Sequence, residues 1–118
     1  GDFVLREWST FLKGRLRRTD ILGRYGGEEV VVILPETDAP TAVIVMNKIR
    51  EALPQELAEP FGKVGITHTI TMSVGVAQVQ ENDSVYQQAL TRADNRVYIA
   101  KELGRNRVVY WDRPQEAA

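Results

Sequence analysis

Apolar residues recur with two different periods along the chain, and the changes of period divide it into seven predicted elements. The first is an amphipathic helix, because an apolar side chain returns at every fourth position near the N-terminus. The apolar positions of this helix are Val4, Trp8, Leu12 and Leu16, with Leu5 and Phe11 widening the face. Trp8 and Phe11 lie at helical spacing, so we interpret them as core residues rather than as a binding platform.

A hairpin of two strands is predicted after this helix. Residues 30–34 form an unbroken apolar run that is typical of a buried strand and ends at Pro35. Ile21, Leu22 and Tyr25 indicate a partner strand directly before it.

Gly26 and Gly27 stand between these two strands, where glycine accepts the positive φ that tight turns require. Glu28 and Glu29 are therefore expected where the turn enters the second strand. Adjacent carboxylates beside two glycines can bind a metal ion and let a phosphate-bearing substrate approach the backbone. The alternative is an ordinary hairpin with solvated glutamates, and the turn taken alone favours that alternative.

A second helix is predicted after the hairpin, capped by Thr37 or Asp38, with Pro40 tolerated in its first turn. Residues 54–65 are expected to form a loop. The expected buried face of the helix consists of Ala42, Val45, Met46, Ile49 and Leu53.

Alternation of large and small side chains predicts a strand at residues 70–77. Its small face could accept a close-packed helix. A polar turn at residues 81–84 precedes a long helix to about Leu103, which Gly104 is well placed to end in a left-handed cap. A last strand is predicted at residues 107–111. This order of elements indicates an α/β or α+β domain with helices packed on a sheet. The small-face residues are Thr71, Ser73, Gly75 and Ala77.

The composition argues against several kinds of binding site and cross-link. With 118 residues, 43% hydrophobic and 26% charged, the chain has the size and composition of one soluble globular domain. Its net charge of −1 argues against nonspecific binding of nucleic acid by the whole domain. The absence of cysteine excludes disulfides and thiolate metal sites. His68, the only histidine, has no second ligand nearby and is interpreted as a surface or loop residue.

Five segments make the chain resemble one family. The turn reads GGEEV, with Val30 in its last position, and residues 17–20 lie upstream of it. Residues 101–106, Lys-Glu-Leu-Gly-Arg-Asn, lie far downstream, and Gly1-Asp2 and Ala93-Asp94 also match. In order and spacing, from Gly1 to about Trp111, the chain resembles the GGDEF family, the bacterial diguanylate cyclases. Those enzymes condense two GTP molecules into cyclic di-GMP.

The resemblance implies a nucleotide-cyclase palm-like fold with a central, mainly antiparallel sheet flanked by helices. Residues 1–111 would form the GGDEF domain, and residues 112–118 a flexible tail. In the family, a central strand carrying a metal-binding aspartate precedes the first helix. We therefore expect that strand and aspartate to lie upstream of Gly1, in a larger protein. A truncated chain that recruits a strand from another copy is the alternative.

By resemblance, Glu28 is a ligand of Mg²⁺ or Mn²⁺, and Glu29 helps to hold the metal or the attacking hydroxyl. The backbone around Gly26 and Gly27 would lie against the substrate. Divalent cations suit this chemistry because they neutralise the triphosphate and activate the hydroxyl.

Three further residues are expected to bind the nucleotide. Asp2 matches the family residue that accepts hydrogen bonds from the guanine edge, and a helix N-cap is the alternative role. Lys101 and Arg105 match the residues that neutralise the β- and γ-phosphates. The alternative for these two is favourable charge near a helix C-terminus.

Arg17 and Asp20 match the family's inhibitory site, at which the product cyclic di-GMP docks. Arg17 can form a forked pair with phosphate or stack on guanine, while Asp20 can accept from the guanine edge. Arg18 is a candidate assistant, and an ordinary surface ion pair is the alternative. Lys48 stands where the family often has a second arginine, and lysine cannot form the guanidinium fork.

The leading hypothesis is a diguanylate cyclase domain that acts as a homodimer, one GTP in each subunit, under the control of an upstream sensory or regulatory domain. We expect a cytoplasmic domain with no nucleic-acid partner, and no activity from residues 1–118 alone. The alternative from another class is a catalytically silent GGDEF module that binds cyclic di-GMP as a receptor or scaffold. An unrelated palm-like nucleotidyl transferase or nucleotide cyclase is a third hypothesis.

Overall fold

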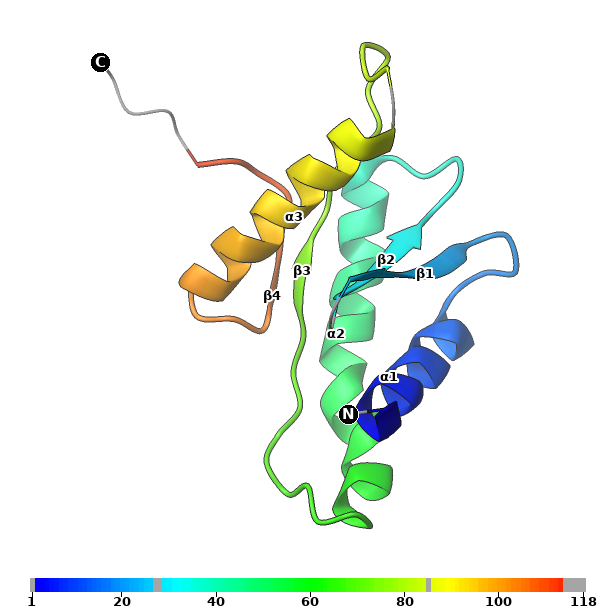
Figure 1. Cartoon of the computed structure of the whole chain (residues 1–118), viewed down its shortest axis with the longest axis vertical. Coiled ribbons are helices and arrows are strands. Elements are labelled where there is room, and N and C mark those ends of the chain that lie inside the picture. The colour runs from blue at the N-terminus through cyan, green and yellow to red at the C-terminus, as the bar shows by residue number, and fades with distance from the viewer. Residues whose placement is uncertain (1, 27–28, 85, 114–118) are drawn as a thin grey trace. The chain divides into compact units, whose positions relative to one another are not determined.

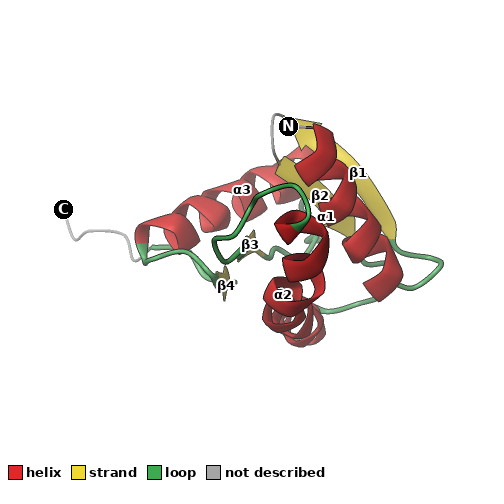
Figure 2. Cartoon of the chain, turned by 90° about the horizontal axis from the view of Figure 1, so that it is seen from below, coloured by secondary structure: helices red, strands yellow, loops and turns green. Residues whose placement is uncertain are grey.

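The seven predicted elements are all present, in the predicted order (Figures 1 and 2). The computed structural model describes residues 2–26, 29–84 and 86–113. The elements are α1 (Asp2–Arg15), β1 (Ile21–Gly26), β2 (Glu29–Ile33), α2 (Ala39–Gly62), β3 (Ser73–Gly75), α3 (Tyr86–Glu102) and β4 (Arg107–Val109).

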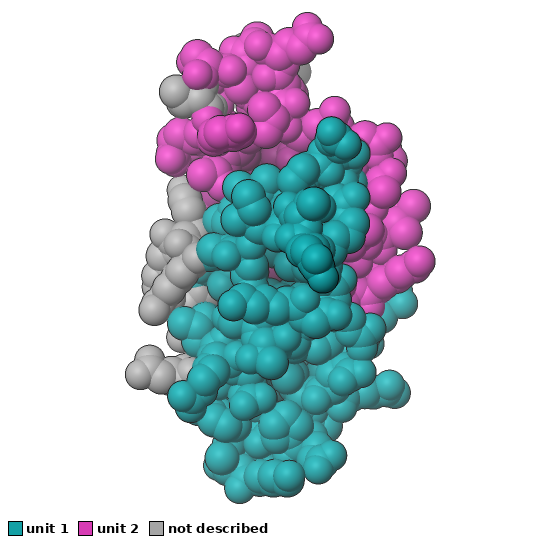
Figure 3. All heavy atoms as spheres, turned by 90° about the vertical axis from the view of Figure 1, so that its right-hand side faces the viewer, with its two compact units in different colours: residues 1–37, 51–70 teal, residues 38–50, 71–118 magenta. Residues whose placement is uncertain are grey.

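The chain divides into two compact units, coloured separately in Figure 3. The first contains residues 1–37 and 51–70, and the second contains residues 38–50 and 71–118. Helix α2 contributes residues to both units.

The hairpin of the first unit is antiparallel, with Ile21 opposite Ile33 and Arg24 opposite Val30. Gly26 pairs with Glu29, so Tyr25 is an extra residue in β1 and produces a β-bulge. The predicted hairpin is therefore confirmed. Residues 27 and 28, which separate the strands, lie outside the described residues.

Residues 54–62 are helical, so the predicted loop at residues 54–65 is wrong over most of its length. Helix α2 continues through Pro54 and Pro60 to Gly62. The reason is that Leu57 and Phe61 extend the apolar face and are only 3% and 1% exposed. Burying each such side chain stabilises by roughly 1.5–3 kcal/mol, which offsets the roughly 3 kcal/mol that an interior proline costs.

Helix α1 packs on the C-terminal part of α2 within the first unit. The rings of Phe3 and Phe61 lie 5.7 Å apart between centroids, and Arg15 donates to Glu56 at 2.7 Å. Leu12 is fully buried, whereas Trp8 and Phe11 are half-buried.

The buried face predicted for α2 is confirmed at four of its positions, and Val45 is half-buried instead. Asp38 is the N-cap of this helix, since its Oδ1 accepts from the Thr41 N–H at 2.9 Å. Hydrogen bonding to Thr41, first from its side chain and then from its N–H, lowers the pKa of the Asp38 carboxyl. The four buried residues are Ala42, Met46, Ile49 and Leu53.

In the second unit β3 and β4 are parallel, with Val74 opposite Val108. Helix α3 crosses over between them and returns the chain in the same direction, as parallel pairing requires. The α/β class is therefore confirmed. The four described strands pair as two two-stranded sheets, one antiparallel and one parallel, in place of one mainly antiparallel sheet.

Gly75 allows α3 to pack directly on β3. A Cβ atom at this position would lie 2.0 Å from the Ala93 carbonyl oxygen and 2.6 Å from the Val97 nitrogen. The predicted small face is thus confirmed at Gly75. Ile99, Ala100 and Val109 form the buried cluster beside it.

Two arginines of α3 form ion pairs around this core. Arg92 forms a forked pair with Asp83 at 2.7 and 2.8 Å, and Arg96 donates to Asp112 at 3.0 Å and to the Val76 carbonyl at 2.7 Å. The Arg92 guanidinium lowers the pKa of Asp83 to about 2.

Two residues of the segment expected as a flexible tail are held against α3. Asp112 pairs with Arg96, and Arg113 pairs with Glu102. The rest of that segment, residues 114–118, lies outside the described residues. Among the helices that the structure describes, none is long and apolar enough to cross a membrane.

Candidate functional site

The GGEEV segment forms the end of the β1–β2 hairpin. Gly26 is the last residue of β1, and Glu29 is the first residue of β2, opposite it. The prediction that Glu29 enters the second strand is therefore confirmed, and its side chain is half-buried. Gly27 and Glu28 lie outside the described residues, as does the side chain of Asp2, the first residue of α1.

A divalent metal ion needs several oxygen ligands at this hairpin. Across residues 2–26, 29–84 and 86–113, no three acidic or histidine side chains gather in a group that could hold one. Glu29 offers a carboxylate of the hard type that Mg²⁺ and Mn²⁺ prefer. The described residues thus suit the metal chemically without supplying a full ligand set, and the role of Glu28 stays a prediction.

Arg17 and Asp20 form a closed turn between α1 and β1. The Asp20 N–H donates to the Arg17 carbonyl at 3.0 Å, and the Arg17 N–H donates to Asp20 Oδ2 at 2.7 Å. The guanidinium completes the contact, with Nε 3.1 Å and Nη2 2.9 Å from Oδ1. The structure therefore brings together the two residues predicted for the inhibitory site.

The two side chains of this turn differ in exposure. Asp20 is only 3% exposed, whereas Arg17 is 57% exposed. Hydrogen bonding to Arg17 lowers the pKa of the Asp20 carboxyl, and the same contact raises the pKa of Arg17. A ligand that reached this turn would therefore contact Arg17 first. Asp20 stays ionised and holds the Arg17 guanidinium in place.

The segment after β2 supplies two more acceptors for Arg17. Nη2 of Arg17 donates to the Pro35 carbonyl and to Thr37 Oγ1, both at 3.0 Å. Thr37 in turn donates to the Pro35 carbonyl at 3.0 Å. Glu36 between them has a φ of 53°, an unusual value for a non-glycine residue. Sequence reasoning did not identify these acceptors.

The Lys-Glu-Leu-Gly-Arg-Asn segment forms the end of α3 and the loop after it. Gly104 donates to the Lys101 carbonyl at 3.3 Å, and the Arg105 N–H donates to the Ala100 carbonyl at 2.9 Å. This pair of bonds is a Schellman motif, with Gly104 at a φ of 120°. The predicted left-handed cap at Gly104 is confirmed.

Lys101 and Arg105 are both exposed, and neither side chain has an ion-pair partner among the described residues. They lie one turn of backbone apart on the second unit, whereas the GGEEV hairpin belongs to the first. Their proximity to Glu29 therefore stays a prediction. The end of α3 and the loop after it thus present two cations without an ion-pair partner in the described part of the chain, as an anionic ligand requires.

Arg50 and Ser73 hold this loop from elsewhere in the second unit. Arg50 Nη1 donates to Asn106 Oδ1 at 3.1 Å, and the Asn106 N–H donates to Ser73 Oγ at 3.3 Å. The sequence gives no local signal for the first contact, because 56 positions separate the two residues.

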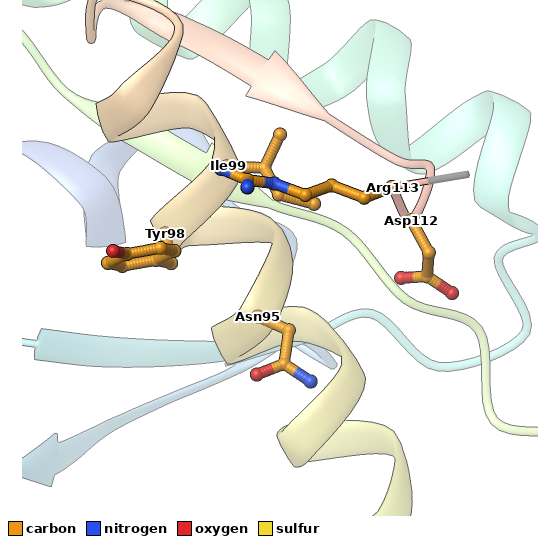
Figure 4. Close-up of a pocket in the computed structure, with 5 residues that line it drawn as sticks. All are labelled: Asn95, Tyr98, Ile99, Asp112 and Arg113. Carbon is orange, nitrogen blue, oxygen red and sulfur yellow. The ribbon is translucent and has the colours of Figure 1, made fainter. Parts of the chain in front are cut away.

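Helix α3 also borders a shallow cavity of about 330 Å³ (Figure 4). It is lined by Asn95, Tyr98, Ile99, Asp112 and Arg113, and none of these is a predicted site residue. His68 lies exposed in a loop, as predicted.

Known proteins resemble this chain over nearly its whole length. The family described as "Diguanylate cyclase, GGDEF domain" matches residues 1–107. Diguanylate cyclase A of Treponema denticola is 35% identical over 108 residues, covering 92% of this chain and 28% of that protein. The response regulator PleD of Caulobacter vibrioides is 38% identical over 114 residues, covering 92% of this chain and 24% of that protein.

A solved structure has the same fold. The active GGEEF domain of a diguanylate cyclase from Vibrio cholerae superimposes with a TM-score of 0.81 at 26% identity, covering 96% of this chain and 69% of that one. The chain spans about a quarter of the length of the two curated relatives. Since the family match extends over residues 1–107 and the fold agrees, this chain belongs to the GGDEF domain family.

Proposed function

We propose that the chain is the catalytic domain of a diguanylate cyclase, which condenses two GTP molecules into cyclic di-GMP and releases pyrophosphate. The observation that carries this proposal is the GGEEV hairpin, in which the Gly26–Glu29 pair beside a β-bulge puts Glu29 at the mouth of the turn. Bulges of this kind aim side chains next to active sites. Membership of the GGDEF family supports the same conclusion.

The proposed roles divide between the two units. Glu28 would hold Mg²⁺ or Mn²⁺, with Glu29 beside it, and Asp2 would accept hydrogen bonds from the guanine edge. The backbone of Gly26 and Gly27 would lie against the nucleotide. When bound, the metal would neutralise the triphosphate and lower the pKa of the attacking 3′-hydroxyl.

Lys101 and Arg105 would bind the β- and γ-phosphates. Their exposure and their place at the Schellman motif that ends α3 support this role. Pyrophosphate leaves with negative charge on those phosphates, so cations that contact them stabilise the leaving group.

Catalysis would require two copies of the domain. Each would hold one GTP, because each new bond joins the 3′-hydroxyl of one nucleotide to the α-phosphate of the other. We propose that an upstream sensory or regulatory domain controls the association of the two copies, and that this takes place in the cytoplasm. We also propose that residues 1–118 alone do not convert GTP. The relative PleD is itself named a response regulator.

Cyclic di-GMP would bind at the Arg17–Asp20 turn and inhibit the enzyme. Arg17 is exposed and held by carboxylate, carbonyl and hydroxyl acceptors, so its guanidinium is already oriented for a planar anionic or aromatic partner. Arg18, which is also exposed, would assist. The same geometry favours the second candidate function, a silent receptor for cyclic di-GMP, if the GGEEV site does not turn over.

Substitution of Glu28, made in the full-length dimeric protein, tests the enzyme against the receptor. Glu28→Gln should abolish conversion of GTP while leaving cyclic di-GMP binding intact, because it removes a metal-binding charge and not a contact of Arg17. Glu81→Gln, at an exposed turn, is the matched control and should retain full turnover. If wild type and Glu28→Gln both bind cyclic di-GMP and neither converts GTP, the receptor function replaces the enzyme.

A further inference from the structure

Three consecutive residues after α3 have left-handed backbone conformations. Their φ values are 120° at Gly104, 65° at Arg105 and 48° at Asn106. Glycine adopts such values readily, and asparagine does so more often than most residues. An arginine adopts a positive φ where surrounding contacts hold it in that conformation. Backbone strain of this kind is concentrated at functional sites.

The enforcing contacts arrive on both sides of Arg105. On its N-terminal side, the Arg105 N–H is bonded to the Ala100 carbonyl at 2.9 Å. On its C-terminal side, Arg50 of α2 donates from Nη1 to Asn106 Oδ1 at 3.1 Å and to the Asn106 carbonyl at 3.4 Å. Ser73 accepts from the Asn106 N–H at 3.3 Å.

Arg50 is itself held in place for this contact. Its Nε donates to Oδ1 of Asn47, one turn earlier in α2, at 3.1 Å. The side chain is half-buried, in contrast to the exposed Arg105. Because its guanidinium is engaged by two asparagines, Arg50 is placed to act on the loop and not on a ligand directly.

We propose that Arg50 is a positioning residue for the β- and γ-phosphates of the bound nucleotide, acting through Asn106 on the backbone of Arg105. This inference rests on the proposed function, in which Lys101 and Arg105 bind those phosphates. Loss of the Arg50 contacts frees Asn106 to leave its left-handed conformation, and the Arg105 backbone then loses the contacts that hold it on its C-terminal side. The effect is confined to ligands that carry the terminal phosphates.

The test compares two ligands and two substitutions in the protein. Binding in the presence of Mg²⁺ is measured for a GTP analogue with a methylene bridge between the α- and β-phosphorus, which cannot condense, and for GMP. Arg50→Met should weaken binding of the analogue roughly tenfold, the size of a contact-mediated coupling, and leave GMP binding unchanged. Asn106→Ala should have a similar effect, and the double variant should be no weaker than either single one.

Controls separate this inference from the function on which it rests. Lys63→Met removes another cation, 72% exposed, and should change neither affinity. If Arg105→Met leaves binding of the analogue unchanged, the phosphate-binding role of the loop is wrong. If Arg105→Met weakens binding of the analogue but Arg50→Met weakens binding of the analogue and of GMP equally, Arg50 does not act through Asn106. The same conclusion follows if the losses of affinity caused by Arg50→Met and Asn106→Ala multiply in the double variant. Should Arg50→Met fail to fold, Arg50→Lys, which keeps the charge without the fork, takes its place with a smaller loss.

Discussion

Gly75 shows how a single residue sets the distance between a helix and a strand. A methyl group there would lie 2.0 Å from the Ala93 carbonyl oxygen, so Gly75→Ala forces α3 away from β3. Overpacking of this kind costs about 1–3 kcal/mol, and contact with rigid backbone puts this case at the upper end. We expect urea unfolding to show a loss of that size.

Gly14 offers a matched control for this prediction. Nothing lies within 4 Å of a Cβ built there, and the residue is inside α1. Gly14→Ala should therefore stabilise the chain by about 0.5–1 kcal/mol. Equal and small effects of the two substitutions would show that α3 does not pack on Gly75 in solution.

The ion pair between Asp83 and Arg92 makes stability depend on pH in the acid range. The folded-state pKa of Asp83 is about 2, below its ordinary value of 3.8. The pair therefore stabilises fully above pH 3.8, and the contribution is lost as the pH falls towards 2. The difference in free energy of unfolding between wild type and Asp83→Asn should be largest near neutral pH and shrink in that window. A difference that stays constant down to pH 2 would contradict the pairing.

At this scale, sequence identified residues whose role is local. Gly104 as a helix cap and Glu29 at a strand start follow from neighbours within a few positions, which determine turn and cap geometry. Arg50 could not be found in this way, because its partner Asn106 becomes adjacent only when α2, α3 and β4 have folded. The same holds for Thr37, whose contact with Arg17 spans 20 positions.

At the scale of elements, α2 is the instructive case. Leu53, Leu57 and Phe61 continue the apolar spacing of the helix, yet Pro54 suggests an end. Rules for single residues favoured the loop, whereas the burial of three large side chains decides the structure. The strands predicted at residues 70–77 and 107–111 are shorter in the structure, because the pairing between β3 and β4 extends over three residues of each strand.

Leu57 tests whether the second half of α2 is part of a packed core. Leu57→Ala should destabilise by about 2–5 kcal/mol, because the side chain is 3% exposed. Ile44→Ala, on the same helix but 57% exposed, should change stability by less than about 1 kcal/mol. Similar small effects in thermal or urea unfolding would mean that residues 54–62 are not packed as described.

At the scale of the molecule, the candidate site is distributed over distant parts of the sequence. Its acidic hairpin belongs to one unit and its basic loop to the other. Local patterns predicted the acidic turn and the helix cap at Gly104, whereas the roles of Lys101 and Arg105 came from the resemblance to the family. Nothing in periodicity joins residue 29 to residue 105. That residues of both parts act on one nucleotide is our proposal, and it rests on membership of the GGDEF family.

The proposed inhibitory role of the Arg17–Asp20 turn predicts a separable change in regulation. Arg17→Ala should spare the initial rate of GTP conversion and abolish the slowing of the reaction by added cyclic di-GMP. The reason is that Arg17 contacts Asp20, Pro35 and Thr37, none of which is a proposed catalytic residue. Progress curves with and without added product measure both quantities. Unchanged binding of cyclic di-GMP by the variant would refute the site.

The central claim, that this GGDEF domain is an active cyclase, is tested most directly by its products. The full-length dimeric protein, with its proposed regulatory domain, is incubated with GTP and Mg²⁺, and cyclic di-GMP and pyrophosphate are quantified together by chromatography and mass spectrometry. The account predicts two pyrophosphates for each cyclic di-GMP formed, and no products from Glu28→Gln. A demonstrably dimeric wild-type protein that binds GTP and forms no cyclic di-GMP would contradict it.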